Sequence, residues 1–407
     1  MSKSLASGRT HLAIPGPSVM PDRVLRAMHR AAPNIYEGDL IDLADTIYTD
    51  LNTIAGNSGD AIIYIGNGHA AWEASLVNTL SRGDRILALV TGRFGLGWVE
   101  MAEALGIDVE LLDFGLNRSA NPDDVEAALK ADTSKKIKAV ITVQTDTATS
   151  LTNDIVGIRR AMTSANHPAL LMVDCIASFA CEPFHMDEWG VDLMITASQK
   201  GLMTPPGIAL MFIRDTVWPS YEKADLKTPY WSWLPRVKPS YFAARFCGTP
   251  PTHHLYGLRE ALDMLLEEGM DNVWERHRVQ AQAVWAAVEA WGESGAIELN
   301  VPIVTDRSLA VTSVKTVEGL APQLREWCEK EMGLTLGVGF SLVRNGEPTN
   351  SAFRIGHMAH LNPHSLLGTL GSIETGLKAL GVAGTGHGVE AAMRVFASSR
   401  THGISNV

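Results

Sequence analysis

The stretch ALLMVDCIASFACEPFHMDEWGVDLMITASQKGLMTPPGIALMFI (residues 169–213) decides the fold. It contains three short apolar runs, ALLMV (169–173), DLMIT (192–196) and GIALMFI (207–213), separated by turns. Four similar runs precede it: AIIYI (61–65), RILALV (85–90), IDVELL (107–112) and KAVITV (138–143). Stretches with apolar residues at helical spacing lie between several of these runs. The alternation predicts an α/β fold with a mainly parallel seven-stranded sheet covered by helices on both faces.

The pattern changes in the C-terminal part of the chain. Residues 255–293 have the spacing of helices, and shorter strands such as LAVTSV and AFRIG follow, mixed with further helices. This shift predicts a smaller α+β domain. We expect an N-terminal segment (1–20), a large domain (21–262), a small domain (263–395) and a tail (396–407). The chain after about residue 385 is expected to be loosely held.

Composition excludes several classes of protein. The 407 residues are 46% hydrophobic, which is enough for a large core, and the net charge of −11 disfavours nucleic-acid or anionic-membrane partners. No apolar run is long enough to span a membrane, and the N-terminus lacks an apolar signal region, so a cytoplasmic protein is expected. Four irregularly spaced cysteines (Cys175, Cys181, Cys247 and Cys328) argue against a disulfide framework or a metal site.

Asp174 and Lys200 are the first candidates for chemistry. Asp174 ends the run ALLMVD, so it lies at the carboxyl end of a predicted central strand, where open α/β sheets bind ligands. Lys200 follows the next strand, in a turn bounded by Gly and Pro. Such a pair can serve a pyridine cofactor: the carboxylate keeps the ring nitrogen protonated, and the lysine attaches the cofactor and then carries a proton. A surface lysine and a helix-capping aspartate are the alternative.

Three further features are weaker alone. Gly66 and Gly68 follow AIIYI and open a helical pattern, where backbone N–H groups can approach a phosphate, although many such turns contain glycines for geometry only. Phe94 follows RILALV and either stacks on a flat ring or packs in the core. Arg354, in AFRIG, either grips a substrate carboxylate with two hydrogen bonds or forms a salt bridge.

Together these features resemble the class V aminotransferases of fold type I, and within them the alanine–glyoxylate and serine–glyoxylate group. The matching strings run from about residue 12 to 380: IPGPSVMP, GNGHAAWEA, QTDTATS, VDCIASF, MDEWGVD, SQKGLMTPPG, LYGLREAL and FRIGH. The resemblance implies pyridoxal 5'-phosphate as cofactor and a homodimer. It also implies ping-pong transfer of an amino group from serine, alanine or aspartate to a small 2-oxo acid such as glyoxylate.

The same resemblance assigns roles around the cofactor ring. Lys200 attaches the cofactor covalently, and Asp174 holds the pyridine nitrogen. Phe94 stacks on the ring, and Thr147 lies near the ring oxygen.

Further roles concern the phosphate and the substrate. The resemblance implies that the cofactor phosphate is bound by the backbone of Gly68 and His69 and by the side chain of Gln199. It also implies a contact from Thr249 of a second subunit. Arg354 binds the substrate carboxylate, and Gly16 lines the substrate pocket.

The chain also departs from the family pattern. Asn67 stands where many relatives have Ser, Phe246 where alanine–glyoxylate enzymes have a phosphate-binding Tyr, and Ser150 where Gly is usual. The aromatic stretch 228–246 is unfamiliar and is a candidate for reshaping the substrate pocket. These departures leave the cofactor assignment intact but leave the substrate open.

Pyridoxamine–pyruvate aminotransferase is the alternative function. It is similar in the DT of TDTATS, in RIGHM and in the GHGVEAA-like tail, and Arg344 stands roughly where it has a second arginine. However, it carries a glutamate in the turn that reads GNGH here. A cysteine desulfurase would need a nucleophilic cysteine on a loop, whereas Cys328 lies in a helical pattern and is expected in the core. A dinucleotide dehydrogenase would need GxGxxG after the first strand.

Overall fold

A computed structural model describes residues 4–340 and 348–399. Its larger sheet has seven strands in the order β2-β10-β9-β8-β5-β3-β4. They are β2 (Asp60–Gly66), β3 (Arg85–Val90), β4 (Asp108–Asp113), β5 (Ile137–Val143), β8 (Leu170–Asp174), β9 (Leu193–Ala197) and β10 (Gly207–Ile213). β10 pairs antiparallel with both of its neighbours, β2 and β9, and the other pairs in this sheet are parallel, so the remaining six strands all run in one direction. All seven predicted strands are therefore confirmed, as is the mainly parallel sheet.

Alternation along the strands explains why both faces are covered. In β8, Leu171 and Val173 pack into the core on one face, while Leu170 and Met172 face the other. The first face is covered by α1 (Asp22–Met28), α2 (Asp39–Ala55), α5 (Pro122–Ala131), α6 (Ile155–Ser164) and α9 (Thr252–Glu268). The second is covered mainly by α3 (Gly68–Thr79) and α4 (Arg93–Ala104), with α7 (Trp218–Lys223) and α8 (Leu234–Val237) beside them.

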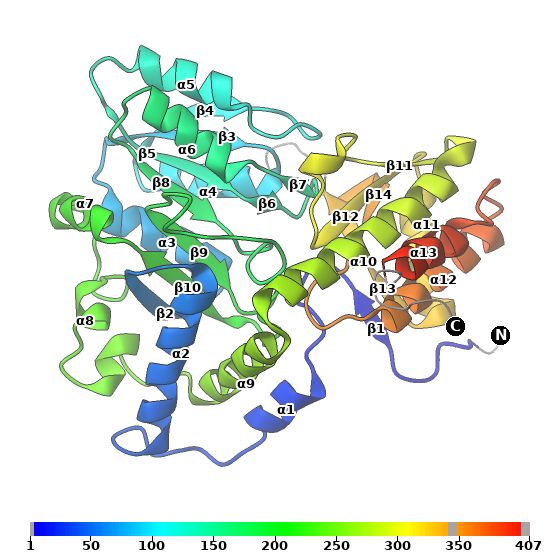
Figure 1. The fold of residues 1–407 in the computed structure, drawn as a ribbon, viewed down its shortest axis with the longest axis horizontal. Coiled ribbons are helices and arrows are strands. Elements are labelled where there is room, and N and C mark those ends of the chain that lie inside the picture. The colour runs from blue at the N-terminus through cyan, green and yellow to red at the C-terminus, as the bar shows by residue number, and fades with distance from the viewer. Residues whose placement is uncertain (1–3, 341–347, 400–407) are drawn as a thin grey trace.

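A smaller sheet lies beside the large one, to its right in Figure 1. Its order is β1-β13-β14-β12-β11, formed by β1 (His11–Ala13), β13 (Leu334–Phe340), β14 (Pro348–Gly356), β12 (Val311–Thr316) and β11 (Ile297–Leu299). Its helices are α10 (Met270–Trp291), α11 (Leu320–Trp327), α12 (Pro363–Ala379) and α13 (Gly388–Ser398). They share a separate apolar core with this sheet.

The N-terminus joins the smaller sheet, because His11–Ala13 pairs in parallel with β13. The predicted domain boundary after residue 262 falls inside α9, and the helical stretch is first broken at Gly269, whose φ is +81°. The domain limits stay a prediction.

The expectation of a loosely held segment after residue 385 is wrong for residues 388–398. These residues form α13, and Ala392 is fully buried in the smaller core. Glu374 accepts hydrogen bonds from Trp291 Nε1 (3.2 Å) and from the N–H of Val389 (2.9 Å), which fixes the start of this helix.

A short hairpin, β6 (Thr145–Asp146) and β7 (Leu151–Thr152), follows β5 at the carboxyl edge of the large sheet. The side chain of Ser150, inside the hairpin, accepts a hydrogen bond from the N–H of Ser313 in the smaller sheet (3.0 Å). The hairpin thus joins the two halves of the chain. Across the described ranges, no helix is both long and apolar enough to cross a membrane.

Candidate active site

A cavity of about 310 Å³ opens at the carboxyl edge of the large sheet. The loops after β2, β3, β5, β8 and β9 all end at this edge, because these strands run in the same direction. Eight of the residues predicted from the sequence line the cavity: Gly16, Gly68, His69, Phe94, Thr147, Asp174, Gln199 and Lys200. Two predicted residues, Arg354 and Thr249, do not line it.

Asp174 ends β8 and is almost fully buried, with 2% of its surface exposed. Its Oδ1 accepts the N–H of Ile176 at 2.7 Å, and its Oδ2 accepts the indole N–H of Trp72 at 2.6 Å. Burial raises the pKa of Asp174 to about 7, and the nearby charge of Asp146 adds to the rise. The two hydrogen bonds and the charge of Lys200 oppose this shift and favour the ionised carboxylate.

Lys200 lies in the turn after β9, and its Nζ donates a hydrogen bond to the carbonyl of Pro15. Burial, together with the positive charge of Arg354, lowers the pKa of Lys200 to about 8. The amine is therefore closer to neutral near physiological pH than an exposed lysine.

Gly16 makes room for that lysine. A Cβ at position 16 would lie 2.7 Å from Cδ, Cε and Nζ of Lys200, and Gly16 has a φ of +113°, which side chains disfavour. Only glycine fits here without displacing Lys200.

The turn after β2 leads into α3 and lines the cavity at Asn67, Gly68 and His69. A Cβ at Gly68 would lie 2.3 Å from Cδ1 of Ile176, so the glycine lets the turn approach the strand that bears Asp174. Asn67 caps α3, and its Oδ1 accepts the N–H groups of His69 (3.1 Å) and Ala70 (3.4 Å). A phosphate that used the N–H of His69 would have to share it with Asn67, so this role of His69 stays a prediction.

Phe94 lies in the first turn of α4 and lines the cavity. Its position depends on Asp146, a fully buried residue that was not among the predicted site residues. Oδ2 of Asp146 accepts the N–H groups of Phe94 (2.8 Å) and Gly95 (3.1 Å), while Oδ1 accepts that of Ala148 (2.9 Å). A carboxylate from the β6–β7 hairpin thus caps α4, whose own first residues offer no side-chain cap.

Arg354 lies on β14, next to the cavity, and is 6% exposed. Its Nε donates to the carbonyl of Val338 (2.6 Å) and its Nη1 to the carbonyl of Thr147 (2.9 Å). The guanidinium carbon lies 4.6 Å from the ring centre of Phe340, which meets Phe94 edge to face at 6.4 Å. Burial lowers the pKa of Arg354 to about 10, so the group remains cationic at neutral pH.

The remaining predicted features lie elsewhere. Thr249 is exposed and outside the cavity. The aromatic stretch 228–246 contributes no side chain to the cavity within the described residues and packs against β2 and α3 instead. Tyr64 donates its hydroxyl to the carbonyl of Trp231 (2.8 Å), and Arg236 lies over the Tyr64 ring (4.3 Å). Arg344 lies outside the described residues.

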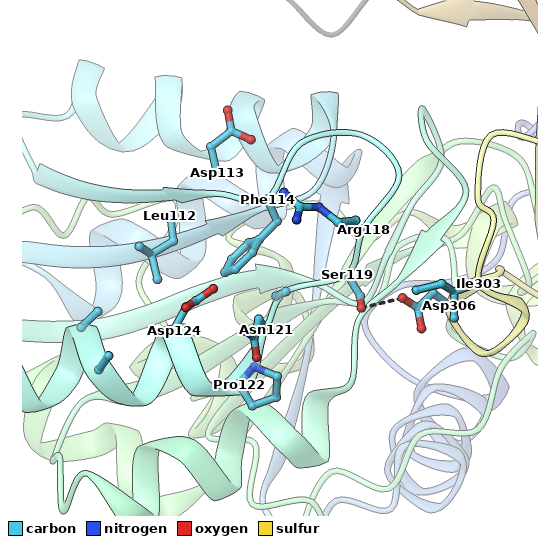
Figure 2. Close-up of a pocket in the computed structure, with 13 residues that line it drawn as sticks. Leu112, Asp113, Phe114, Arg118, Ser119, Asn121, Pro122, Asp124, Ile303 and Asp306 are labelled. Carbon is cyan, nitrogen blue, oxygen red and sulfur yellow. Dashed lines mark hydrogen bonds between the residues drawn. The ribbon is translucent and has the colours of Figure 1, made fainter.

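Neither Cys328 nor the residues of a second hollow line this cavity. Cys328 is buried in a helical turn, as expected, and burial raises its pKa to about 12, which leaves it unreactive. A hollow of about 760 Å³ lies near the end of β4 and the start of α5, where Ser119 donates to Oδ2 of Asp306 at 2.7 Å. Figure 2 shows the side chains that line it. None of the predicted site residues lines it.

Comparison with known proteins agrees with this geometry. The family model of class-V aminotransferases matches residues 36–359. A serine–glyoxylate aminotransferase of Methylorubrum extorquens is 38% identical over 400 residues, which cover 96% of this chain and 97% of that protein. A serine–glyoxylate aminotransferase of Arabidopsis thaliana is 34% identical over 375 residues, which cover 92% of each.

A solved structure shares the fold. The crystal structure of pyridoxamine-pyruvate aminotransferase from Mesorhizobium loti matches with a TM-score of 0.87 at 24% identity, covering 98% of this chain and 100% of that one. The chain belongs to the class V aminotransferase family. It is an aminotransferase built on fold type I.

Proposed function

We propose that this aminotransferase uses pyridoxal 5'-phosphate to move an amino group from a small amino acid to glyoxylate or a similar 2-oxo acid. The observation that carries the proposal is the convergence of Asp174, Lys200 and Phe94 on one cavity, with Arg354 beside it. An acid, an amine of lowered pKa, an aromatic ring and a carboxylate-binding guanidinium are what this chemistry requires.

The residues present fit the cofactor. The side chain of Gln199 lines the cavity, where its Nε2 amide group could donate to a phosphate. The close approach at Gly68 keeps backbone N–H groups near the same place. Asp174 would hold the ring nitrogen, and Lys200 would attach the cofactor. When bound, pyridoxal phosphate supplies a carbonyl group that takes up amines and a ring that accepts electron density.

The chain's own groups divide the work. Arg354, still positively charged at neutral pH, binds the substrate's α-carboxylate, and its bond to Thr147 fixes the direction of the guanidinium. Lys200 Nζ takes the proton from the substrate's α-carbon and returns it in the second half of the cycle, which its lowered pKa favours. Asp174, shielded from water, keeps the ring nitrogen protonated.

Serine is the favoured donor and glyoxylate the favoured acceptor. Support comes from the serine–glyoxylate relatives. Alanine and aspartate remain alternative donors. Pyridoxamine–pyruvate transfer remains the alternative function, with a more distant sequence relative and a likeness of fold behind it.

A homodimer completes the proposal. Thr249 is exposed and does not line its own cavity, which suits a residue that contacts the phosphate of a second subunit. Phe246 is buried and offers no hydroxyl to that phosphate. Sedimentation of the holoenzyme should give a dimer or a multiple of it, and a purely monomeric active species would contradict this part. A reducing compartment such as the cytoplasm suits the four free cysteines.

The decisive experiment is a visible absorption spectrum of the purified protein, repeated with serine, alanine, aspartate and pyridoxamine added singly. We expect a yellow protein that one amino acid bleaches and glyoxylate restores. Bleaching by pyridoxamine alone, reversed by pyruvate, would favour the alternative function. A colourless protein that takes up no added pyridoxal phosphate would overturn the proposal.

A further inference from the structure

The indole of Trp72 lies directly against the carboxylate that the proposed function assigns to the ring nitrogen. Trp72, in α3, is 1% exposed, lines the cavity, and donates its Nε1–H to Oδ2 of Asp174 at 2.6 Å. An indole nitrogen can only donate, so this contact is strongest when Asp174 is ionised. Trp72 is therefore matched to one charge state of Asp174.

Packing prevents the indole from turning away. Trp72 stacks on Trp98 with a ring-centre distance of 6.3 Å and an interplanar angle of 13°, and His69 lies at 4.4 Å on a tilted plane. A Cβ at Gly97 would lie 3.0 Å from Cζ3 of Trp72. The donor is thus held at a fixed position before any ligand arrives.

The surroundings of Asp174 make this donor necessary. Besides the N–H of Ile176, the charged groups that act on it are Asp146, which disfavours a second negative charge, and Lys200, which favours it. On the other side of the indole, burial and the charge of Arg93 lower the pKa of His69, so His69 contributes little positive charge. The negative charge of Asp146 and the positive charge of Lys200 act on Asp174 in opposite directions. The two hydrogen bonds from Ile176 and Trp72 therefore decide whether Asp174 is ionised.

We propose that Trp72 is a positioning residue that keeps Asp174 ionised and aimed at the cofactor's ring nitrogen, and that it thereby sets the acid limit of cofactor retention and turnover. This inference rests on the proposed function. It concerns a residue that touches both the cavity and the acid, and it predicts a pH effect that a packing role alone would not produce.

The test compares holoenzymes of the wild type, Trp72→Phe and Trp98→Phe. Trp98 is the matched control, because it is equally buried and stacked on Trp72, yet its Nε1 has no hydrogen-bond partner. Two quantities are measured from pH 5 to 9 in steps of about half a pH unit: bound cofactor, by visible absorption after dilution, and kcat/KM.

For Trp72→Phe we expect roughly 10- to 100-fold weaker cofactor binding, the size of a lost hydrogen bond to a charged group. The acid limb of both profiles should move about one pH unit upward. Trp98→Phe keeps an aromatic ring against Trp72 and leaves the Trp72 N–H in place, so it should keep the acid limb of the wild type even if it is less stable. Replacing Trp72 with 3-benzothienylalanine, which has the shape of tryptophan without the N–H, should reproduce the Phe variant and covers the case in which that variant folds poorly.

Two failures are distinguishable. If the wild type retains no cofactor, the proposed function is wrong. If the wild type retains it, and both replacements at position 72 share the acid limb of the wild type and of Trp98→Phe, the role of Trp72 is wrong.

Discussion

Arg354 donates a hydrogen bond of 2.9 Å to the carbonyl of Thr147, although 207 residues separate the two in the chain. Thr147 lines the cavity, and Arg354 belongs to a strand of the smaller sheet. The bond ties the position of the guanidinium that we propose binds the substrate to a loop that we propose borders the cofactor. A change on either side is therefore expected to alter both binding steps.

Replacing Lys200 with Ala should remove the visible absorption of the attached cofactor and lower kcat by roughly 10²- to 10⁴-fold through lost proton transfer alone. Lys223→Ala, which alters an exposed lysine on α7, is the control and should leave both unchanged. Far-ultraviolet circular dichroism checks that the variant remains folded. Undiminished turnover in Lys200→Ala would refute the assignment.

Arg354→Lys should raise KM for both amino and oxo acids while the protein still binds cofactor. Lysine keeps the positive charge but lacks the planar guanidinium group, which can donate to the carbonyls of Val338 and Thr147 and to a carboxylate at the same time. Disrupting a buried charge pair costs about 2 kcal/mol or more, so kcat/KM should fall at least about 30-fold. Steady-state kinetics with serine and glyoxylate measure this, with Arg118→Lys on the exposed surface as control. An unchanged KM would place the carboxylate elsewhere.

Asp146→Ala should lower the free energy of unfolding by about 1–3 kcal/mol, because three buried N–H groups lose their acceptor. Since Phe94 is one of them, cofactor affinity should fall as well. Urea denaturation and cofactor titration measure the two effects, with the exposed Asp123→Ala as control. A loss of stability without any loss of cofactor affinity would show that Asp146 does not contribute to cofactor binding.

Two buried histidines should make the protein sensitive to acid. His277 accepts the N–H of Ala359 at 3.0 Å, and burial lowers the pKa values of His277 and His357 to about 3. In the unfolded chain both protonate near pH 6.5, so the unfolded state binds more protons below that pH. The free energy of unfolding should therefore fall by about 1.4 kcal/mol per pH unit for each histidine between about pH 6 and pH 3.

Urea denaturation at pH 7, 6 and 5 measures that slope. His277→Gln can donate and accept as the histidine does but cannot titrate, so its stability should depend less on pH than that of the wild type. Equal slopes would show that His277 does not contribute to acid unfolding. Comparing slopes removes the contribution of buried carboxyl groups such as Glu182, whose pKa burial raises.

The larger sheet could be predicted because most of its strands are apolar runs, although acidic residues interrupt β4. The rule that ligands bind at the carboxyl edge accounted for Asp174 and Lys200. Gly16, His69, Thr147 and Gln199 were predicted only from the resemblance to the family. The smaller sheet was harder. Its strand β1 has three residues and pairs with a strand more than 300 residues later, which no local pattern reveals. Glycines interrupt the apolar alternation of β13, so that strand was missed as well.

Asp146 and Trp72 were missed for a different reason. Asp146 follows β5 at the same sheet edge as Asp174, so the edge rule would have included it. Trp72 has the helical spacing of a core residue, and it does lie in the core. Its contact with Asp174 depends on how α3 packs against the end of β8, which the sequence does not reveal.

The β6–β7 hairpin limits how such proteins can be recombined. It carries Asp146 toward Phe94, Thr147 toward Arg354 and Ser150 toward Ser313. A chimaera that takes the large domain from one family member and the small domain from another would break these contacts unless the hairpin and its partners in β12 and β14 came from the same parent. We therefore expect the two halves of the chain to evolve together. A change in the residues proposed to hold the cofactor should be accompanied by a change in those proposed to bind the substrate.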